Sequence, residues 1–338
     1  MSGTDNGAAL RDLLPPDARE RLATLRLADG VATLVFDVAG LDRLAGDKLE
    51  IAVKAALRGA PGVREVRVAL TADRGPAEQA AQAATIAGPT RRIIAVGSGK
   101  DGVGKSTLSA NLAIALMRQG IKVGLVDADI YGPSQPRLLA NEGQRPEARD
   151  NKLIPVPSPW GVPVLSMGHL VEPGRAIAWR GPMAGNALGQ LIDADWGDAE
   201  VLVVDLPPGT GDVQLTMVQR YKPAGAVIIS TPQDLALIDA TRAMSFFEQA
   251  QVPLIGMVEN MSGYVCPHCG ETSDPFGHGG AEAVARSMDI PFLGHVPLDL
   301  AIRQDSDAGK PPAAGDTPQG KAFGAIARRV AEWLDQTA

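Results

Sequence analysis

Short apolar runs alternate with stretches of helical periodicity from Arg91 to the end of the chain. Runs that are apolar at nearly every position are typical of parallel strands buried on both faces of a sheet. The predicted strands are Ile93–Val96, Val123–Val126, Val162–Leu165, Val201–Val204, Ala226–Ile229, Leu254–Val258 and Phe292–Val296. Their alternation with helices predicts a doubly wound, mostly parallel α/β sheet with helices on both sides.

The first part of the chain predicts a separate small α/β domain at residues 10–73. Pro15 and Pro16 interrupt any helix that begins at Leu10, because proline lacks the backbone donor that a helix interior needs. The elements predicted after this break are a helix at Asp17–Thr24, strands at Val31–Val38 and Val63–Leu70, and a helix at Gly46–Leu57.

Two stretches carry no core pattern. Residues 1–9 are predicted to be a disordered start. Residues 74–90 are rich in Ala, Gln, Gly and Pro and are predicted to be a linker. The large predicted domain therefore spans residues 91–338.

The chain has 338 residues, a net charge of −7 and two cysteines. An acidic chain lacks the positive field that attracts nucleic acid or an anionic membrane surface. The N-terminus is polar, without a secretory apolar segment, and no apolar run is long enough to span a bilayer. We therefore expect a cytoplasmic protein that binds neither nucleic acid nor membrane.

A glycine-rich loop follows the first strand of the large domain and matches the pattern G-x-x-x-x-G-K-[ST]. A strand precedes the loop and an amphipathic segment, Thr107–Met117, follows it, which favours a phosphate-binding loop over a chance glycine-rich turn. Lys105 is expected to reach the β- and γ-phosphates of ATP, and Ser106 to bind Mg²⁺. The predicted nucleotide-binding residues of the loop are Gly99, Lys100, Asp101, Gly102, Val103, Gly104, Lys105, Ser106 and Thr107.

Lys100, the second residue of this loop, resembles the extra lysine of the deviant Walker-A class, which includes MinD, ParA and the nitrogenase iron protein. In that class the lysine crosses a dimer interface and contacts the partner subunit's nucleotide. A cation at that place helps to neutralise charge that develops in phosphoryl transfer. The resemblance implies a homodimer whose closure is coupled to ATP. A solvated surface lysine is the alternative.

Carboxylates end two of the predicted strands. Asp205 follows four apolar residues, the Walker-B arrangement, in which the carboxylate holds Mg²⁺ directly or through water. By resemblance to the deviant Walker-A class, Asp129 is expected to orient the attacking water, with support from Asp127. The segment Pro208–Asp212 resembles a switch loop, whose glycines permit a change of backbone. Aspartates that merely cap turns are the alternative.

The predicted catalytic set is therefore Lys100, Lys105, Asp129 and Asp205. Two further residues complete the predicted nucleotide site. Asn260 matches the position that contacts the adenine base in related ATPases, and Pro297 is expected to help frame that base.

Cys266 and Cys269 form a C-P-H-C motif within the glycine-rich segment Met261–Gly280. A zinc site in one chain would need further ligands such as His268 or His278, and the spacing does not match common zinc-finger patterns. A redox dithiol normally opens a helix near the first βαβ unit. Two cysteines per chain become four across a two-fold axis, which suits a bridging [4Fe–4S] cluster or a bridging zinc ion. We favour the cluster; zinc, a redox dithiol and inert cysteines are the alternatives.

Together these motifs resemble the Mrp/ApbC-type iron–sulfur cluster carriers over about residues 91–335. The resemblance implies a homodimer that binds a labile [4Fe–4S] cluster on the paired Cys266 and Cys269. It also implies slow ATP hydrolysis that gates transfer of the cluster from an assembly scaffold to apo-proteins. The small N-terminal domain is similar to an iron–sulfur-assembly domain often fused to bacterial members. The matching segments are Gly99–Thr107, Asp127–Ser134, Trp179–Met183, Asp205–Asp212, Glu259–Met261 and Cys266–Cys269.

One residue departs from the family pattern, which has glycine where this chain has Asp101. An acidic side chain there can repel the nucleotide or hinder close approach of the backbone. Alternatively, Asp101 points outward or pairs with Lys100 of the same or the partner chain.

Three rival functions stay open: a MinD/ParA-like positioning ATPase, a zinc-bridged nucleotide-binding scaffold, and an iron–sulfur reductase like the nitrogenase iron protein, which would need a redox partner. A positioning ATPase would use a basic amphipathic helix or a basic stripe, whereas the C-terminal segment Phe323–Leu334 has two arginines. Metal analysis separates the zinc scaffold from the carrier. His169 and His295 lie beside apolar strands and are expected to pack or hydrogen-bond rather than bind a metal.

Overall fold

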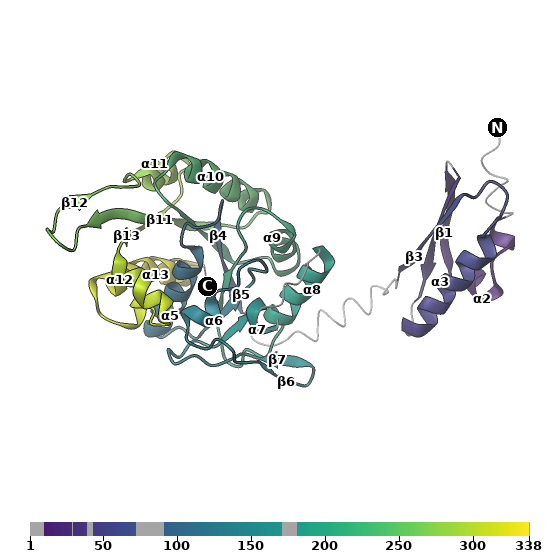
Figure 1. Ribbon diagram of the computed structural model, residues 1–338, viewed down its shortest axis with the longest axis horizontal. Coiled ribbons are helices and arrows are strands. Elements are labelled where there is room, and N and C mark those ends of the chain that lie inside the picture. Colours follow the sequence, from purple (N-terminus) through teal and green to yellow (C-terminus); the bar gives the residue numbers. More distant parts are fainter. Residues whose placement is uncertain (1–9, 29, 39–42, 72–90, 171–180, 338) are drawn as a thin grey trace. The chain divides into compact units, whose positions relative to one another are not determined.

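The computed structural model describes residues 10–28, 30–38, 43–71, 91–170 and 181–337. The chain divides into two compact units, Met1–Ala87 and Gly88–Ala338 (Figure 1). The predicted disordered start at residues 1–9 and the predicted linker at residues 74–90 lie outside the described residues, as do Trp179 and Arg180.

The described part of the first unit contains a three-stranded sheet and helices that pack on it. Strand β1 (Leu22–Ala28) pairs antiparallel with β2 (Val31–Asp37), and β2 pairs parallel with β3 (Glu65–Thr71). The helices are α2 (Pro16–Glu20) and α3 (Arg43–Leu57), and Ala18 and Val53 from them reach the core around Leu34 and Phe36. The two predicted strands and the predicted helix between them are confirmed.

The prediction of one helix over Asp17–Thr24 is wrong. The helix ends at Glu20, and Leu22–Ala28 forms β1. Leu25 and Leu27 of this strand pack on the core while β2 satisfies its backbone groups. Pairing with a strand distant in sequence therefore overrides the weak local helical pattern.

The second unit is built on a sheet of parallel strands. Its strand order is β12-β11-β10-β4-β9-β5-β8, with β13 also paired to β11. Seven of these strands run parallel, and the short β12 is antiparallel to β11. The seven predicted strands are confirmed as β4 (Arg92–Ser98), β5 (Val123–Asp127), β8 (Val164–Ser166), β9 (Val201–Asp205), β10 (Gly225–Ser230), β11 (Leu254–Val265) and β13 (Phe292–Leu298).

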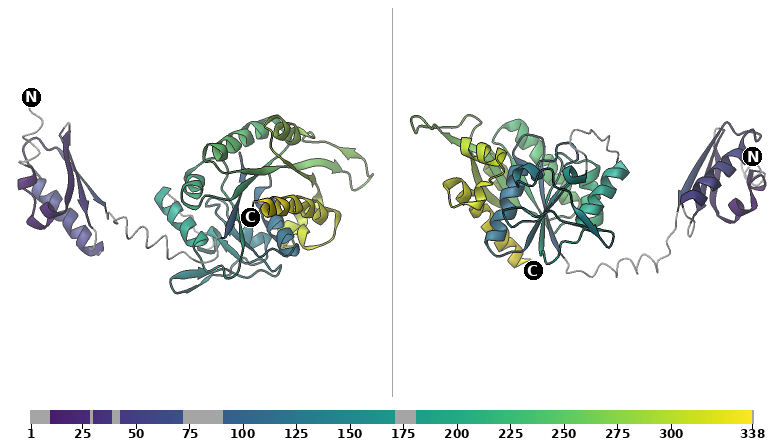
Figure 2. Two further views of the ribbon diagram at one scale, coloured as in Figure 1. Left: turned by 180° about the vertical axis from the view of Figure 1, so that it is seen from behind. Right: turned by 60° about the horizontal axis from the view of Figure 1, so that its bottom comes forward.

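Helices cover both faces of this sheet, as Figures 1 and 2 show. One face carries α5 (Lys105–Arg118), α12 (Leu300–Asp307) and α13 (Pro318–Gln336). The other carries α8 (Gly181–Ile192), α9 (Asp212–Thr216), α10 (Asp234–Gln249) and α11 (Gly280–Ser287). Alternate residues of one strand pack into the cores on opposite faces of the sheet. In β4, Ile94 and Val96 pack into the core under α5 and α13, and Ile93 and Ala95 pack into the core under α8 and α10. This two-sided burial explains the unbroken apolar runs of the sequence.

The remaining elements are short. They are α6 (Gln135–Leu138), α7 (Met167–Leu170), β6 (Glu147–Arg149), β7 (Lys152–Ile154), β12 (Thr272–Ser273), a π-helical turn at Met217–Tyr221 and a 3₁₀ turn at Pro312–Ala314. Among the described residues, no helix combines the length and the apolar character that crossing a bilayer requires.

We expect Gly124→Ala to lower the free energy of unfolding by about 1–3 kcal/mol, because it overpacks the core. A Cβ at Gly124 would overlap the indole ring of the buried Trp196 and would lie 2.9 Å from Leu202 Cδ2. Urea unfolding measures the change. Gly324→Ala is the matched control: a Cβ there meets no heavy atom within 4 Å. It should raise stability by up to about 1 kcal/mol through helix propensity. An unchanged Gly124→Ala protein would contradict the tight packing of Trp196.

Candidate functional site

The glycine-rich loop joins the central strand β4 to α5. Gly102 and Gly104 have φ of +77° and +89°, in the left-handed region that favours glycine. At Gly99 a Cβ would overlap the backbone of Asp239, so α10 packs directly against the start of the loop. The loop borders an opening of about 400 Å³, lined by Lys100, Asp101, Gly102, Gly104, Lys105, Ser106, Thr107, Asp129, Tyr131 and Gly132. The structure thus brings most of the predicted phosphate-binding residues and Asp129 together.

Lys105 begins α5 and turns into the protein, with 6% of its surface exposed. Its Nζ lies 2.7 Å from Asp205 Oδ1 and 3.7 Å from Asp129 Oδ2. Burial alone lowers the pKa of Lys105, but the charges of Asp205, Asp129 and Asp127 outweigh burial and raise that pKa above its ordinary value. Lys105 therefore stays charged at neutral pH and balances the carboxylates around it.

Asp127, at the end of β5, is fully buried. Its Oδ2 accepts hydrogen bonds from the backbone N–H groups of Ser134 and Gln135, at 3.0 and 3.1 Å, and from Ser166 Oγ at 2.8 Å. Burial and the neighbouring Asp205 raise the pKa of Asp127 to about 7, although these hydrogen bonds and Lys105 oppose the shift. Asp127 thus holds in place the segment that follows Asp129.

Both oxygens of the buried Asp205 have hydrogen-bond donors. Oδ1 accepts from Lys105 Nζ and, at 3.1 Å, from Ser109 Oγ, while Oδ2 accepts from Gln135 Nε2 at 2.8 Å. Gln135 Nε2 also donates to the Ser106 carbonyl at 2.9 Å. Both carboxylate oxygens of Asp205 are therefore engaged by protein donors.

Ser109 and Gln135 are site residues that the sequence patterns did not predict. Ser109 is a fully buried hydroxyl next to the buried apolar residues Leu108 and Ala110, and that polarity was the one available signal. Gln135 reaches Asp205 across 70 positions of sequence, and no spacing rule marks such a contact.

Lys100 and Asp101 lie at the mouth of the opening, and the Asp101 side chain is exposed. The φ of Asp101 is outside the left-handed region, so the loop accommodates a residue other than glycine without backbone strain. Among the described residues, Asp101 forms no ion pair with Lys100 of its own chain. The charge of Asp101 therefore lies at the opening next to the predicted phosphate-binding loop.

Asn260 on β11 braces the loop from one side. Its Nδ2 donates to the Val103 carbonyl at 2.7 Å, and it packs so closely on Gly104 that a Cβ there would overlap it. Pro297 follows Val296, which pairs with Asn260 across β13 and β11. Neither Asn260 nor Pro297 lines the opening described above. Their contact with adenine stays a prediction.

The cysteines lie at the tip of a hairpin that extends β11 and β12 beyond the helices (Figure 1). Tyr264 and Val265 pair with Ser273 and Thr272, so the chain between them turns sharply. Both cysteines are free thiols; Cys266 is half-buried and Cys269 is exposed. Hydrogen bonds from the backbone N–H groups of Cys269 and His268 lower the pKa of Cys266. The hairpin therefore presents two accessible thiols, one of them disposed to form a thiolate.

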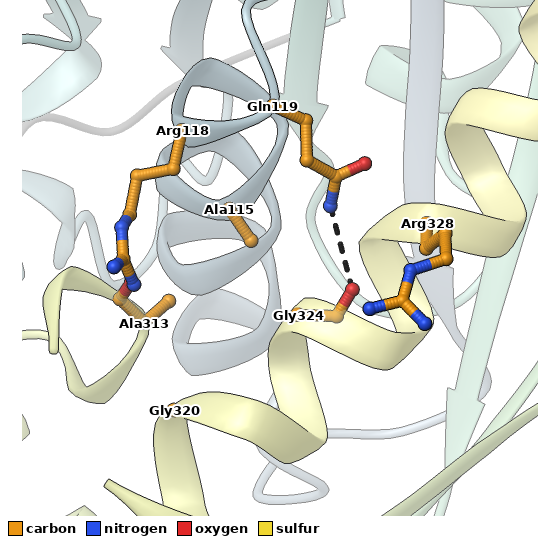
Figure 3. Close-up of a pocket in the computed structure, with 7 residues that line it drawn as sticks. All are labelled: Ala115, Arg118, Gln119, Ala313, Gly320, Gly324 and Arg328. Carbon is orange, nitrogen blue, oxygen red and sulfur yellow. Dashed lines mark hydrogen bonds between the residues drawn. The ribbon is translucent and has the colours of Figure 1, made fainter. Parts of the chain in front are cut away.

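A second hollow, of about 270 Å³, lies between α5 and α13 (Figure 3). Arg118 and Arg328 border it, and Gln119 Nε2 donates across it to the Gly324 carbonyl at 3.4 Å. Arg118 is held by the Ala313 carbonyl and by Asp316. Helix rise separates Arg118 from Lys105 by roughly 20 Å. This hollow is therefore separate from the phosphate-binding loop.

A glycine loop between a buried parallel strand and a helix, a buried lysine, and carboxylates at the ends of neighbouring strands together define a P-loop nucleotide-binding protein. A family profile described as ParA, "NUBPL iron-transfer P-loop NTPase", matches residues 89–331. The chain belongs to this family.

Comparison with known proteins agrees with this assignment. A Deinococcus radiodurans protein named iron-sulfur cluster carrier protein is 44% identical over 288 residues, which are 84% of this chain and 80% of the relative. The solved structure of an Archaeoglobus fulgidus nucleotide-binding protein in complex with ADP has a TM-score of 0.60 and 38% identity, and covers 69% of this chain and 91% of its own. The Pyrococcus furiosus cell division ATPase MinD, at TM-score 0.55 and 23% identity, covers 72% of this chain and 99% of its own and shows the shared fold.

We expect Lys105→Met to destabilise the nucleotide-free protein by about 3 kcal/mol at about pH 8, because it leaves buried carboxylates without a cation. The loss should shrink at about pH 5.5. The pKa of Asp127 is raised to about 7, so Asp127 is protonated below that pH in the folded state and one negative charge disappears. Urea unfolding at both pH values measures this. Lys100→Met, which alters a lysine at the mouth of the opening, is the control and should change little. A loss independent of pH would contradict the charge balance.

We expect Asp101→Gly to bind ATP about twofold to fivefold more tightly than the natural protein, because an exposed charge near phosphate contributes roughly 0.2–1 kcal/mol. Asp101→Asn removes the charge but keeps the side chain, and it should produce most of the gain. Nucleotide titration and steady-state ATP turnover measure both variants. Equal affinity and turnover in all three proteins would show that Asp101 is neutral in the loop.

Proposed function

We propose that this protein is a cytoplasmic ATP-hydrolysing carrier that holds a labile [4Fe–4S] cluster across a homodimer and transfers the cluster to apo-proteins. A cluster-assembly scaffold is the donor in this proposal. The observation that carries the proposal is the pair Cys266 and Cys269 at the exposed tip of a hairpin in a P-loop NTPase. The printed name of the Deinococcus radiodurans relative, iron-sulfur cluster carrier protein, supports it.

The position of the cysteines on an exposed hairpin suits a cluster that is bound and later released. Two thiols per chain satisfy four iron sites only when two chains meet, and four cysteine ligands are what a [4Fe–4S] cluster needs. Opening of such an interface exposes the cluster, whereas four ligands from one chain would hold it through any change of assembly. The lowered pKa of Cys266 favours the thiolate that binds metal.

The nucleotide site suits ATP with Mg²⁺. In the proposal Lys105 binds the β- and γ-phosphates, Ser106 and Asp205 hold Mg²⁺, and Asp129 orients the attacking water. Lys105 now pairs with Asp205 at 2.7 Å, so phosphate must draw it away from that carboxylate. Bound Mg²⁺ would supply positive charge next to Asp205 in place of the ammonium. In the proposal Lys100, which lines the opening, contacts the partner subunit's nucleotide.

Strand β11 offers a direct link between the two sites. Asn260 on this strand hydrogen-bonds the loop at Val103, and Cys266 follows six residues further along the same chain segment. Strand rise puts the two at most about 20 Å apart. A shift of the loop on ATP binding therefore acts on the strand that carries the cysteines, which provides a route by which nucleotide gates the interface.

Anaerobic reconstitution with iron and sulfide tests the proposal. We expect about four irons and four sulfides per dimer, the stoichiometry of one bridging [4Fe–4S] cluster. A variant with Cys266→Ser and Cys269→Ser should lose the cluster but keep ATP binding, because the hairpin tip lies outside the phosphate-binding loop. Metal analysis, absorbance and sizing of the dimer read out the result, and transfer to an apo-protein with and without ATP follows it.

The outcomes separate the rival functions. Zinc alone, held by the cysteines, would establish the zinc-bridged scaffold instead. A metal-free dimer that still binds and hydrolyses ATP would leave a nucleotide-driven switch like the positioning ATPases.

A further inference from the structure

Three side chains capable of binding metal converge at the base of the cysteine hairpin, away from the cysteines themselves. Glu259 lies on β11, His278 just before α11, and His295 on β13. One ligand atom from each lies within 4.8 Å of the other two. Glu259 is buried, His295 is half-buried and His278 is exposed, so the group is anchored on the protein side and accessible from solvent.

The Ser262 hydroxyl occupies the centre of this group. Its Oγ lies 2.7 Å from Glu259 Oε1, 2.9 Å from His278 Nδ1 and 3.1 Å from His295 Nδ1. His295 Nδ1 also lies 3.2 Å from Glu259 Oε1. A hydroxyl has one proton to donate. The two ring nitrogens and the Glu259 carboxylate therefore compete for the single O–H donor of Ser262. A cation placed beside the hydroxyl would satisfy all three at once.

The charge around this point favours a cation. Two N–H groups at the start of α11, from Gly279 and Ala281, fix Glu259 as a carboxylate at 2.9 and 2.8 Å. Glu282 Oε2 adds a second carboxylate 3.7 Å from His295 Nε2.

Few positively charged side chains compete with a metal ion for these carboxylates. Among the described residues, Glu259 has no lysine or arginine partner. Arg286 contacts Glu282 at the rim, at 3.3 Å, where both side chains are exposed.

We propose that Glu259, His278 and His295 form a second metal site, for a divalent transition-metal ion of the Zn²⁺ or Co²⁺ type. Two imidazoles and one carboxylate, with water in the fourth position, are a familiar ligand set for such ions. Bonds of about 2.0–2.2 Å place tetrahedral ligands roughly 3.3 Å apart. The two rings, now stacked with centroids 5.1 Å apart, must tilt and close in by about an ångström, which the exposed His278 allows.

A metal ion at this site would restrict the motion of the segment that carries the cysteines, Met261–Gly280. Glu259 stands just before that segment and His278 lies near its end, while Glu259 already receives hydrogen bonds from the residues that begin α11. An ion shared by Glu259 and His278 therefore closes the loop at its base, and His295 fastens it to the neighbouring strand β13. Bound metal should order the hairpin without using a thiol.

Cobalt titration of the full-length Cys266→Ser, Cys269→Ser protein tests the proposal, because this background removes the thiol ligands. We expect one Co²⁺ per chain, with visible d–d bands but without thiolate-to-cobalt charge transfer. His278→Ala and His295→Ala should each weaken binding by roughly tenfold or more, at least the cost of losing an outer-shell partner.

Two controls sharpen the test. His268→Ala removes an exposed histidine of the same hairpin that lies outside the group, and it should leave affinity unchanged within about twofold. Ser262→Ala removes the central hydroxyl but no ligand, and it should bind at least as well as its parent. Circular dichroism and ATP binding confirm that each variant is folded. Absence of Co²⁺ binding in the cysteine-free protein, or binding that ignores both His278→Ala and His295→Ala, would overturn the proposal. The result does not depend on whether the cysteines hold a cluster.

Discussion

The balance of charge around one buried ammonium group shapes the nucleotide site. Lys105 Nζ lies 2.7 Å from Asp205 and 3.7 Å from Asp129, with Asp127 buried behind them. Charges removed from water interact strongly, so losing Lys105 would leave the buried carboxylates without a compensating cation. The strand order satisfies this constraint: β4, β9 and β5 are parallel neighbours, and Asp127 and Asp205 are paired across β5 and β9. The loop and its carboxylates must therefore lie at the same edge of the sheet.

The same balance explains how the site can respond to ligand. Asp205 is held by Lys105, Ser109 and Gln135, and Gln135 also contacts the Ser106 carbonyl. Phosphate and Mg²⁺ would redistribute these partners without exposing a buried charge. Because Asp127 holds the backbone at Ser134 and Gln135, such an exchange acts on a connected segment rather than on one side chain.

Strand β11 is the second organising element. Along a short stretch it braces the phosphate-binding loop through Asn260, anchors the start of α11 through Glu259, and continues into the hairpin with Cys266 and Cys269. Its neighbours β10 and β13 pair with it as far as Glu259 and Asn260, and pairing with β13 resumes at Tyr264 after an irregularity. In the proposed function this strand is the route from the nucleotide site to the cysteines.

The sequence by itself determined the doubly wound sheet, the phosphate-binding loop and the pairing of Cys266 with Cys269, because these depend on periodicity and short spacing. It failed at Leu22–Ala28, where a distant strand partner outweighs a weak helical pattern. Only the tertiary structure decided that Gln135 and Ser109 hold Asp205, and that Glu259, His278 and His295 meet around Ser262. These contacts join residues far apart in sequence, and the packing of strands and helices, not any local pattern, brings their side chains together.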